Sequence, residues 1–258
     1  MRDLCPFAEA FLGPHEGTQP KPEGSLAIDE LSVQEAYEVQ KLVIDARVAG
    51  GERVVGYKVG CTSRAIRRQF GLAEPICGRL LAPHVHHGNA VLDWRDFHSC
   101  AVEPELVLTI GRDLADEVGE EADLTGAIEC VSPGIEVHNY RFRFGPPMLQ
   151  ELIASNGIHA CLVVGEPAAA PGSFDWDLEG MGLFVSGELA ASGIGAEILG
   201  GPMRSLGWLV NHLVRRGGRL EAGQLVIPGS AVELVSVALG DRITARFTHA
   251  GAVEAMFR

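Results

Sequence analysis

The sequence predicts an α+β protein built mainly from mixed or antiparallel β-sheet, with a smaller α/β region at its N-terminus. Helix signals gather before residue 80, whereas short β-branched and apolar segments bounded by Gly and Pro dominate after it. Helical periodicity returns convincingly only once, between Pro202 and Arg216. We therefore expect two regions: residues 1–80, with an arm, a helix and a lysine-bearing strand, and a β-rich domain over residues 81–258.

Composition narrows the class of protein. The 258 residues are 47% hydrophobic, which is ample material for a core, and no apolar run approaches the roughly 20 residues of a membrane span. A formal charge of -13 excludes the basic footprint that nucleic acid requires. No secretory signal is visible, and six scattered cysteines without a C-x-x-C pair are typical of reduced thiols. A cytoplasmic enzyme without nucleic-acid or membrane partners is indicated.

The first elements follow from local signals. Residues 1–24 are rich in Gly and Pro, which favours an irregular arm. Ser32 and Glu35 form a capping-box pattern, and the helix that it opens is expected to reach about Arg47. The pair Gly50-Gly51 ends this helix.

A strand carrying one lysine comes next. Residues 53–60 are mostly β-branched or apolar around Lys58, and a polar turn follows over residues 61–63. Residues 64–70 can form a short helix that stops at Gly71.

The remainder is predicted as strands joined by Gly- and Pro-marked turns. The expected strands cover residues 100–110, 130–138, 158–165, 181–188, 224–228 and 242–248. One helix interrupts them over residues 202–216, with apolar side chains at helical spacing and basic residues in its last turn.

Glu103 and Glu105 are the most informative pair in the chain. They lie one residue apart in the strand over residues 100–110, where alternate side chains share a face. Two like charges on one strand face repel unless a cation lies between them. Because carboxylate oxygens are the ligands of hard cations, the pair indicates Mg²⁺ or Mn²⁺. The alternative is an ordinary solvated strand face.

The order of several sequence blocks carries a family resemblance. The blocks are Leu31-Ser32, Gly56-Tyr57-Lys58-Val59-Gly60-Cys61-Thr62-Ser63, Glu74-Pro75, Val102-Glu103-Pro104-Glu105, Gly134-Ile135-Glu136-Val137, Ala154-Ser155-Asn156, Trp208-Leu209-Val210-Asn211 and Gly240-Asp241. From about residue 28 to the C-terminus, this series resembles the 2-keto-4-pentenoate hydratase / 4-oxalocrotonate decarboxylase family of the fumarylacetoacetate hydrolase superfamily. The resemblance implies a mixed β-sheet roll of the fumarylacetoacetate hydrolase type.

The resemblance also implies a metal site and a reaction. Matched by position, Glu103, Glu105 and Glu136 would hold Mg²⁺ or Mn²⁺ and leave open positions for a small anionic 2-oxo acid. The metal would act as a Lewis acid on the enolate formed at C2. Further copies of the chain, as a homo-oligomer, and a related lyase are the expected protein partners.

Lys58 matches the family's active-site lysine. Its apolar neighbours predict partial desolvation, which would lower its pKa and suit it to proton transfer or carboxylate binding; the alternative is a surface lysine. Thr62 and Ser63 would offer donors to the substrate carboxylate, or serve only in a turn. His159, like His138, would lie near the metal strands, as a proton carrier or as a hydrogen-bonded core histidine.

The chain also departs from the family pattern. Ile76 stands where many hydratases carry an aspartate, so Ile76 would line the substrate site without activating water. Ser155 and Asn139 replace two further acidic residues.

Three activities and one non-catalytic role are therefore open. Hydration of a 2-oxo-enoate or 2-hydroxy-dienoate in aromatic-compound degradation ranks first. Decarboxylation of a 2-oxo-enedioate ranks second, with Ile76 as its support. Hydrolytic C–C cleavage of an acylpyruvate ranks third, and a non-catalytic partner subunit is the alternative of a different kind. The run His84, His86 and His87 could bind a transition metal, but a polar loop is favoured.

Overall fold

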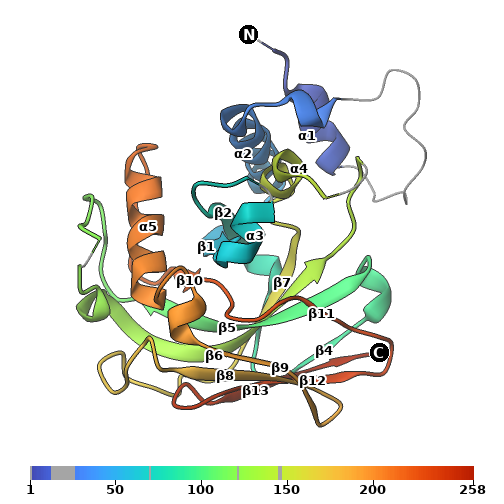
Figure 1. Ribbon diagram of the computed structural model, residues 1–258. Coiled ribbons are helices and arrows are strands. Elements are labelled where there is room, and N and C mark those ends of the chain that lie inside the picture. Colours follow the sequence, from blue (N-terminus) through green and yellow to red (C-terminus); the bar gives the residue numbers. More distant parts are fainter. Residues whose placement is uncertain (1, 13–26, 70, 121, 145–146) are drawn as a thin grey trace.

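The computed structural model describes residues 2–12, 27–69, 71–120, 122–144 and 147–258. Two β-sheets form its lower layers, and helices cover one end of the larger sheet (Figure 1). The helices are α1 (Cys5–Leu12), α2 (Val33–Ala49), α3 (Arg64–Gln69), α4 (Leu149–Ala154) and α5 (Pro202–Val214), with 3₁₀ turns η1 (Ile28–Glu30), η2 (Ala82–His84), η3 (Trp94–Asp96), η4 (Thr125–Ala127) and η5 (Gly195–Glu197).

The larger sheet has eight strands in the order β2-β1-β10-β5-β6-β7-β3, with β11 paired to β5. These strands are β1 (Val54–Gly60), β2 (Ile76–Leu81), β3 (Val85–His87), β5 (Cys100–Ile110), β6 (Ile128–Asn139), β7 (His159–Val164), β10 (Leu225–Ile227) and β11 (Val235–Ser236). The long antiparallel pair β5–β6 is its centre. Strand β10 pairs antiparallel with β5, and β1 pairs in parallel with β10. The lysine strand therefore belongs to the same sheet as the glutamate strands.

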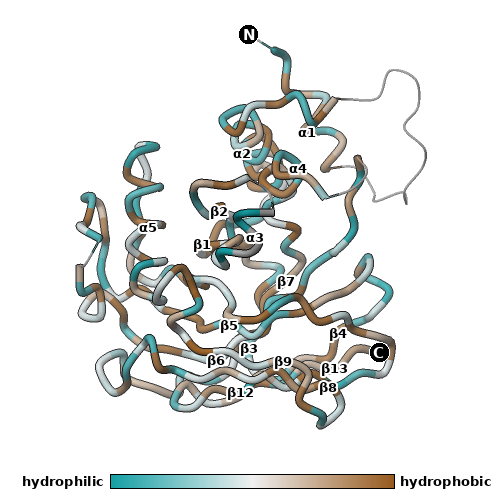
Figure 2. The backbone as a smooth tube through the Cα atoms, viewed as in Figure 1, coloured by the Kyte–Doolittle hydropathy of each residue, from teal (hydrophilic) through white to brown (hydrophobic). Residues whose placement is uncertain are grey.

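The second sheet has five strands in the order β4-β13-β12-β8-β9. They are β4 (Ala90–Leu92), β8 (Gly180–Val185), β9 (Glu188–Ile194), β12 (Arg242–Phe247) and β13 (Ala252–Phe257). The main core lies between the sheets, where Leu106 and Ile135 belong to one buried cluster with Leu183 and Ile243. Hydrophobic residues accordingly occur along strands of both layers (Figure 2).

The N-terminal helices form a smaller layer of their own. Phe7 of α1, Val39 and Val43 of α2 and Ala154 of α4 share a second buried cluster. The prediction of an irregular arm over residues 1–24 is wrong for Cys5–Leu12, because these residues form helix α1, on which Phe7 and Ala8 are buried. Residues 13–26 lie outside the described residues.

Most predicted elements are confirmed, with differences at their ends. Helix α2 begins at the Ser32–Glu35 capping box and ends before Gly50. The single strand expected over residues 181–188 is a hairpin, because Ser186 and Gly187 take positive φ values of 49° and 97° and turn the chain from β8 into β9. Strands β2, β3, β4, β11 and β13 and helix α4 were not predicted. The division at residue 80 stays a prediction.

None of the helices in the described part of the chain is long and apolar enough to cross a membrane.

Candidate metal and active site

Three glutamates gather on one face of the central strands. In the β5–β6 register Glu103 lies opposite Glu136, and Glu105 lies opposite Gly134. Because directly opposed residues of an antiparallel pair project to the same side, the three carboxylates share that face, as strand alternation predicts for the first two. Glu105 and Glu136 are each only 1% exposed. The Glu103 side chain is 20% exposed, so the face is largely buried and is not an ordinary solvated strand face.

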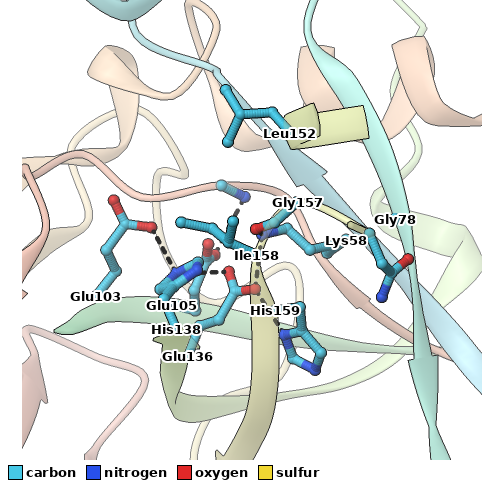
Figure 3. Close-up of polar contacts among 12 residues, drawn as sticks. Lys58, Gly78, Glu103, Glu105, Glu136, His138, Leu152, Gly157, Ile158 and His159 are labelled. Carbon is cyan, nitrogen blue, oxygen red and sulfur yellow. Dashed lines mark hydrogen bonds and ion pairs between the residues drawn. The ribbon is translucent and has the colours of Figure 1, made fainter. Parts of the chain in front are cut away.

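Glu136 is the centre of the charged contacts (Figure 3). Its Oε1 lies 2.7 Å from Lys58 Nζ and 2.7 Å from His159 Nδ1, and its Oε2 lies 3.5 Å from His138 Nε2. Burial alone would raise the pKa of Glu136, but the positive potential of His138 and Lys58, with the His159 hydrogen bond, lowers the pKa. Glu136 is therefore held ionised.

Glu105 is in the opposite situation. Burial, followed by repulsion from Glu136 and Glu103, raises its pKa well above the usual range. The opposing influences are Lys58 and the backbone N–H of Gly229, which donates to Glu105 Oε2 over 3.1 Å. The negative charge of this face exceeds what the protein's own cations balance, and that excess fits a divalent cation.

The donor atoms also fit a metal. One ligand atom each from Glu103, Glu136 and His138 lies within 4.8 Å of the other two. His138 Nε2 is 3.3 Å from Glu103 Oε2, yet both of its buried ring nitrogens lack a hydrogen-bond partner among the described residues. The carboxylate oxygens suit Mg²⁺ or Mn²⁺, whereas an imidazole nitrogen is a more usual ligand of Zn, Cu or Fe. The sequence placed His138 near the metal but not among its ligands, and the assignment of Glu103, Glu105 and Glu136 as ligands stays a prediction.

Lys58 is buried on β1, with only 3% of its surface exposed. The expectation that its pKa would be lowered is wrong. Burial does lower it, but Glu136, and after it Glu103 and Glu105, outweigh burial and raise the pKa. Lys58 is therefore a fixed ammonium, and Nζ also donates to the carbonyl oxygen of Gly157 over 3.2 Å.

Two glycines and an asparagine make room for Lys58. A Cβ on Gly78, which lies opposite Lys58, would be 2.8 Å from Lys58 Cγ, and one on Gly157 would be 3.1 Å from Lys58 Nζ. Asn156 accepts from the backbone N–H of Arg79 over 2.7 Å and donates to the Arg79 carbonyl over 2.8 Å. These contacts hold the chain before Gly157 against β2, and nothing in the sequence indicates that long-range pairing.

The proposed substrate-contacting residues lie around Lys58. Ile76 is buried and pairs with Gly60 in the β1–β2 register, on the same face as Lys58, where it packs in a cluster with Leu152 and Ile158. Thr62 is buried, and its Oγ1 donates to the carbonyl oxygen of Ser230 over 3.4 Å. Ser63 is half-buried at the start of α3. Their contacts with a substrate stay predictions.

His159 connects the metal face with a cavity of about 400 Å³ behind it, which Asn139, Arg141 and Arg143 also line. Burial lowers the pKa of His159, although the hydrogen bond to Glu136 opposes this. Its Nε2 is buried and has no hydrogen-bond partner among the described residues. The ring is thus neutral and offers one uncommitted nitrogen.

The run His84, His86 and His87 lies apart from the glutamate face. His86 and His87 form the edge strand β3 beside β7, and His84 contacts the guanidinium of Arg47. Within the described ranges these three side chains form no metal-binding group. The favoured polar loop is wrong as well, because β3 is a strand.

The chain is similar over nearly its whole length to bacterial lyases. It is 32% identical to the 2-keto-4-pentenoate hydratase of Paraburkholderia phymatum over 92% of this chain and 87% of that protein. It is also 32% identical to the 2-keto-4-pentenoate hydratase of Burkholderia vietnamiensis over 100% of this chain and 89% of that protein. No protein-family model matches the chain.

Solved structures confirm the fold. The 4-oxalocrotonate decarboxylase of Pseudomonas putida G7, complexed with magnesium and adipate, superposes with a TM-score of 0.89 at 27% identity, covering 99% of this chain and 97% of that chain. The fumarylpyruvate hydrolase of Pseudomonas aeruginosa, in complex with Mn²⁺ and pyruvate, has a TM-score of 0.62 at 18% identity, covering 78% and 88%. The expected α+β fold of the fumarylacetoacetate hydrolase type is thus established.

Proposed function

Because the chain belongs to the 2-keto-4-pentenoate hydratase family, we propose that it is a metal-dependent lyase that adds water to a small 2-oxo-enoate or its 2-hydroxy-dienoate tautomer. The observation that carries this proposal is the buried face on which Glu103, Glu105 and Glu136 meet the ammonium of Lys58. Such a face binds a cation and, through the cation and the lysine, an acidic substrate that the protein's overall negative charge would otherwise repel.

We assign the metal to Glu103, Glu105 and Glu136, with His138 as a further candidate ligand. When bound, Mg²⁺ or Mn²⁺ supplies a Lewis acid for the negative charge that develops on the 2-keto oxygen. The magnesium in the decarboxylase structure and the Mn²⁺ in the hydrolase structure support this choice of metal. Each of the four side chains lies on β5 or β6, so the rigid centre of the sheet holds them.

Lys58 is assigned to charge stabilisation and proton donation. Its raised pKa keeps the ammonium protonated, so it can hold the substrate carboxylate or deliver a proton to C3 or C5 of a dienolate. Thr62 and Ser63 lie on the turn that follows β1, and we place them beside the same carboxylate.

His159 is assigned to the opposite proton transfer. If its Nδ1–H donates to Glu136, the buried Nε2 on the far side of the ring is an acceptor that can hold a proton. The cavity that His159 shares with Asn139 gives a route for that proton away from the metal face.

Decarboxylation of a 2-oxo-enedioate is the second candidate. Ile76 occupies the Lys58 face of the β1–β2 pair, packed against Leu152 and Ile158, and offers no carboxylate to activate water. Loss of CO₂ leaves an electron pair in a dienolate that the same cation and Lys58 can stabilise. The near-complete superposition with a 4-oxalocrotonate decarboxylase supports this alternative.

Product analysis separates the two. The purified chain with Mg²⁺ or Mn²⁺ is incubated with 2-hydroxy-2,4-pentadienoate and, separately, with 4-oxalocrotonate. Formation of 4-hydroxy-2-oxopentanoate is the expected result, whereas CO₂ release from 4-oxalocrotonate without hydration would identify the decarboxylase. The proposal would be refuted if neither product formed and a Glu136→Gln variant behaved like the wild type.

We further propose that the enzyme is cytoplasmic, forms a homo-oligomer and associates with a related lyase. The six cysteines are all free, which suits a reducing compartment. Leu178 and Leu189 at the second sheet, and Leu239, expose 69%, 57% and 59% of their surface, and such side chains suit burial against another copy. Sedimentation equilibrium of the purified chain measures its oligomeric state, and a monomer would contradict this proposal.

A further inference from the structure

A second cavity lies on the side of the β1–β2 pair that faces away from Lys58. It has a volume of about 690 Å³ and is lined by residues of α2, of the β1–β2 pair and of the end of α5. Figure 1 shows how these elements are arranged. In the β1–β2 register Tyr57 lies opposite Arg79, and Lys58 lies opposite Gly78. Since neighbouring residues of a strand point to opposite faces, Tyr57 and Arg79 line this cavity while Lys58 faces the glutamates.

The cavity concentrates positive charge in an acidic protein. Arg79, Arg215, Arg216 and Lys41 line it, against the single carboxylate of Glu38. Lys41 and Arg215 are engaged elsewhere, in ion pairs with Asp45 and Glu117. The chain as a whole carries a formal charge of -13, so this surface is a local exception.

Arg79 and Arg216 have no such neutralising partner. Arg79 Nη1 donates to Gln40 Oε1 over 2.8 Å, and Arg216 stacks 4.9 Å above the ring of Tyr37. Neither guanidinium forms an ion pair with a carboxylate among the described residues. Both are held in place by neutral groups, which fixes their geometry and leaves their charge uncompensated.

A buried histidine reports the same positive potential. His212 is 7% exposed and lines the cavity, and Arg216 Nη1 lies 3.2 Å from its Nδ1. Burial, followed by Arg216, Arg79 and Arg215, lowers the pKa of His212 to about 3. A neutral imidazole surrounded by guanidinium groups adds a hydrogen-bonding group without adding a repelling carboxylate.

We propose that this cavity is a second ligand site, which binds a small oxyanion carrying phosphate or carboxylate groups between Arg79 and Arg216. Guanidinium groups bind both kinds of oxyanion through paired N–H donors. The Lys58 site is separated from it by the β1–β2 pair. Occupancy of the cavity therefore does not require the metal.

Calorimetric titration tests the site with defined probes. Inorganic phosphate and, separately, succinate are titrated into the metal-free full chain at constant ionic strength, so that no bound Mn²⁺ can hold the probe at the Lys58 site. At least one probe should bind saturably, and the probe that binds identifies the ligand as a phosphate or a carboxylate. Arg79→Gln and Arg216→Gln should each weaken that binding about tenfold or more, because each removes a charged hydrogen-bond donor.

Two controls locate the effect. Arg242→Gln removes an equal charge from an exposed position on β12, and Glu103→Gln alters the metal site; both should bind the probe as the wild type does. Circular dichroism and Mn²⁺ affinity show whether the Arg79 and Arg216 variants remain folded. The proposal is overturned if neither probe binds saturably, if both cavity variants bind like the wild type, or if Arg242→Gln weakens binding equally.

Discussion

Replacing Lys58 by methionine tests the charge balance on which the active-site assignment rests. Lys58 Nζ lies 2.7 Å from Glu136 Oε1, and the two side chains are only 4% and 1% exposed. Methionine keeps the length of the side chain but leaves Glu136 without its ammonium partner. Breaking a buried pair in this way costs ~3–5 kcal/mol.

The magnitude can be read as a melting temperature. In a chain of this size, each kcal/mol shifts the melting temperature by roughly 2–4 °C, so the metal-free Lys58→Met variant should melt roughly 6–20 °C below the wild type. Mn²⁺ would give the glutamates a replacement positive charge, so the difference should shrink when both proteins are saturated with it. Differential scanning calorimetry with and without Mn²⁺ measures both quantities.

Turnover should respond differently from stability. A proton-donating role for Lys58 is worth ~10²–10⁴-fold, and its loss would lower kcat and kcat/KM together, whereas simple docking of the carboxylate would chiefly raise KM. Lys41→Met is the matched control, because Lys41 is an exposed lysine paired with Asp45 and its loss should change stability by less than about 0.5 kcal/mol. A Lys58→Met variant with wild-type melting and wild-type kinetic constants would refute the assignment.

Three further predictions test other parts of the molecule. Glu105→Gln should weaken Mn²⁺ binding in calorimetry, and an unchanged affinity would remove Glu105 from the ligand set. Gly78→Ala would place a Cβ 2.8 Å from Lys58 Cγ, so it should lower thermal stability by ~1–3 kcal/mol and reduce turnover; wild-type values would show that the strands part easily. The pKa of His212 is about 3 in the folded chain against ~6.5 unfolded, so the unfolded state binds the extra proton as pH falls below ~6.5, and stability falls with it. Between pH 7 and pH 5 the His212→Gln variant should lose about 2 kcal/mol less unfolding free energy than the wild type, as measured by urea titrations. An identical pH dependence in both proteins would contradict this.

Local patterns were sufficient for the elements whose signals are local. The capping box at Ser32 places the start of α2, and strand alternation places Glu103 and Glu105 on one face, because both depend on residues a few positions apart. Glu136 could be joined to that pair only through the family resemblance. Its position opposite Glu103 depends on the register of two strands, which no single segment specifies.

Properties that depend on several residues far apart in the sequence could not be predicted from the sequence. The pKa of Lys58 was predicted in the wrong direction, because its own strand shows the burial but not the carboxylates that oppose it. The hydrogen bonds between Asn156 and Arg79 join a turn to a strand that is distant in the sequence, and neither residue type predicts this contact. The N-terminal helix was missed because its buried face exists only against α2 and α4.

The late position of β10 in the chain has a consequence for how the enzyme is made. Lys58 pairs in parallel with Ile227, Glu105 receives its backbone donor from Gly229, and Thr62 bonds to Ser230 across 168 positions. The hairpin β8–β9 can form from neighbouring segments, but this non-local parallel pairing carries a large loop-closure cost and is expected to be slow. A ribosome-bound chain that lacks these residues has already made its glutamates and its lysine, but not the strand β10 that lies between β1 and β5 in the sheet. Competence for turnover should therefore arise late in refolding, after most of the secondary structure is detectable.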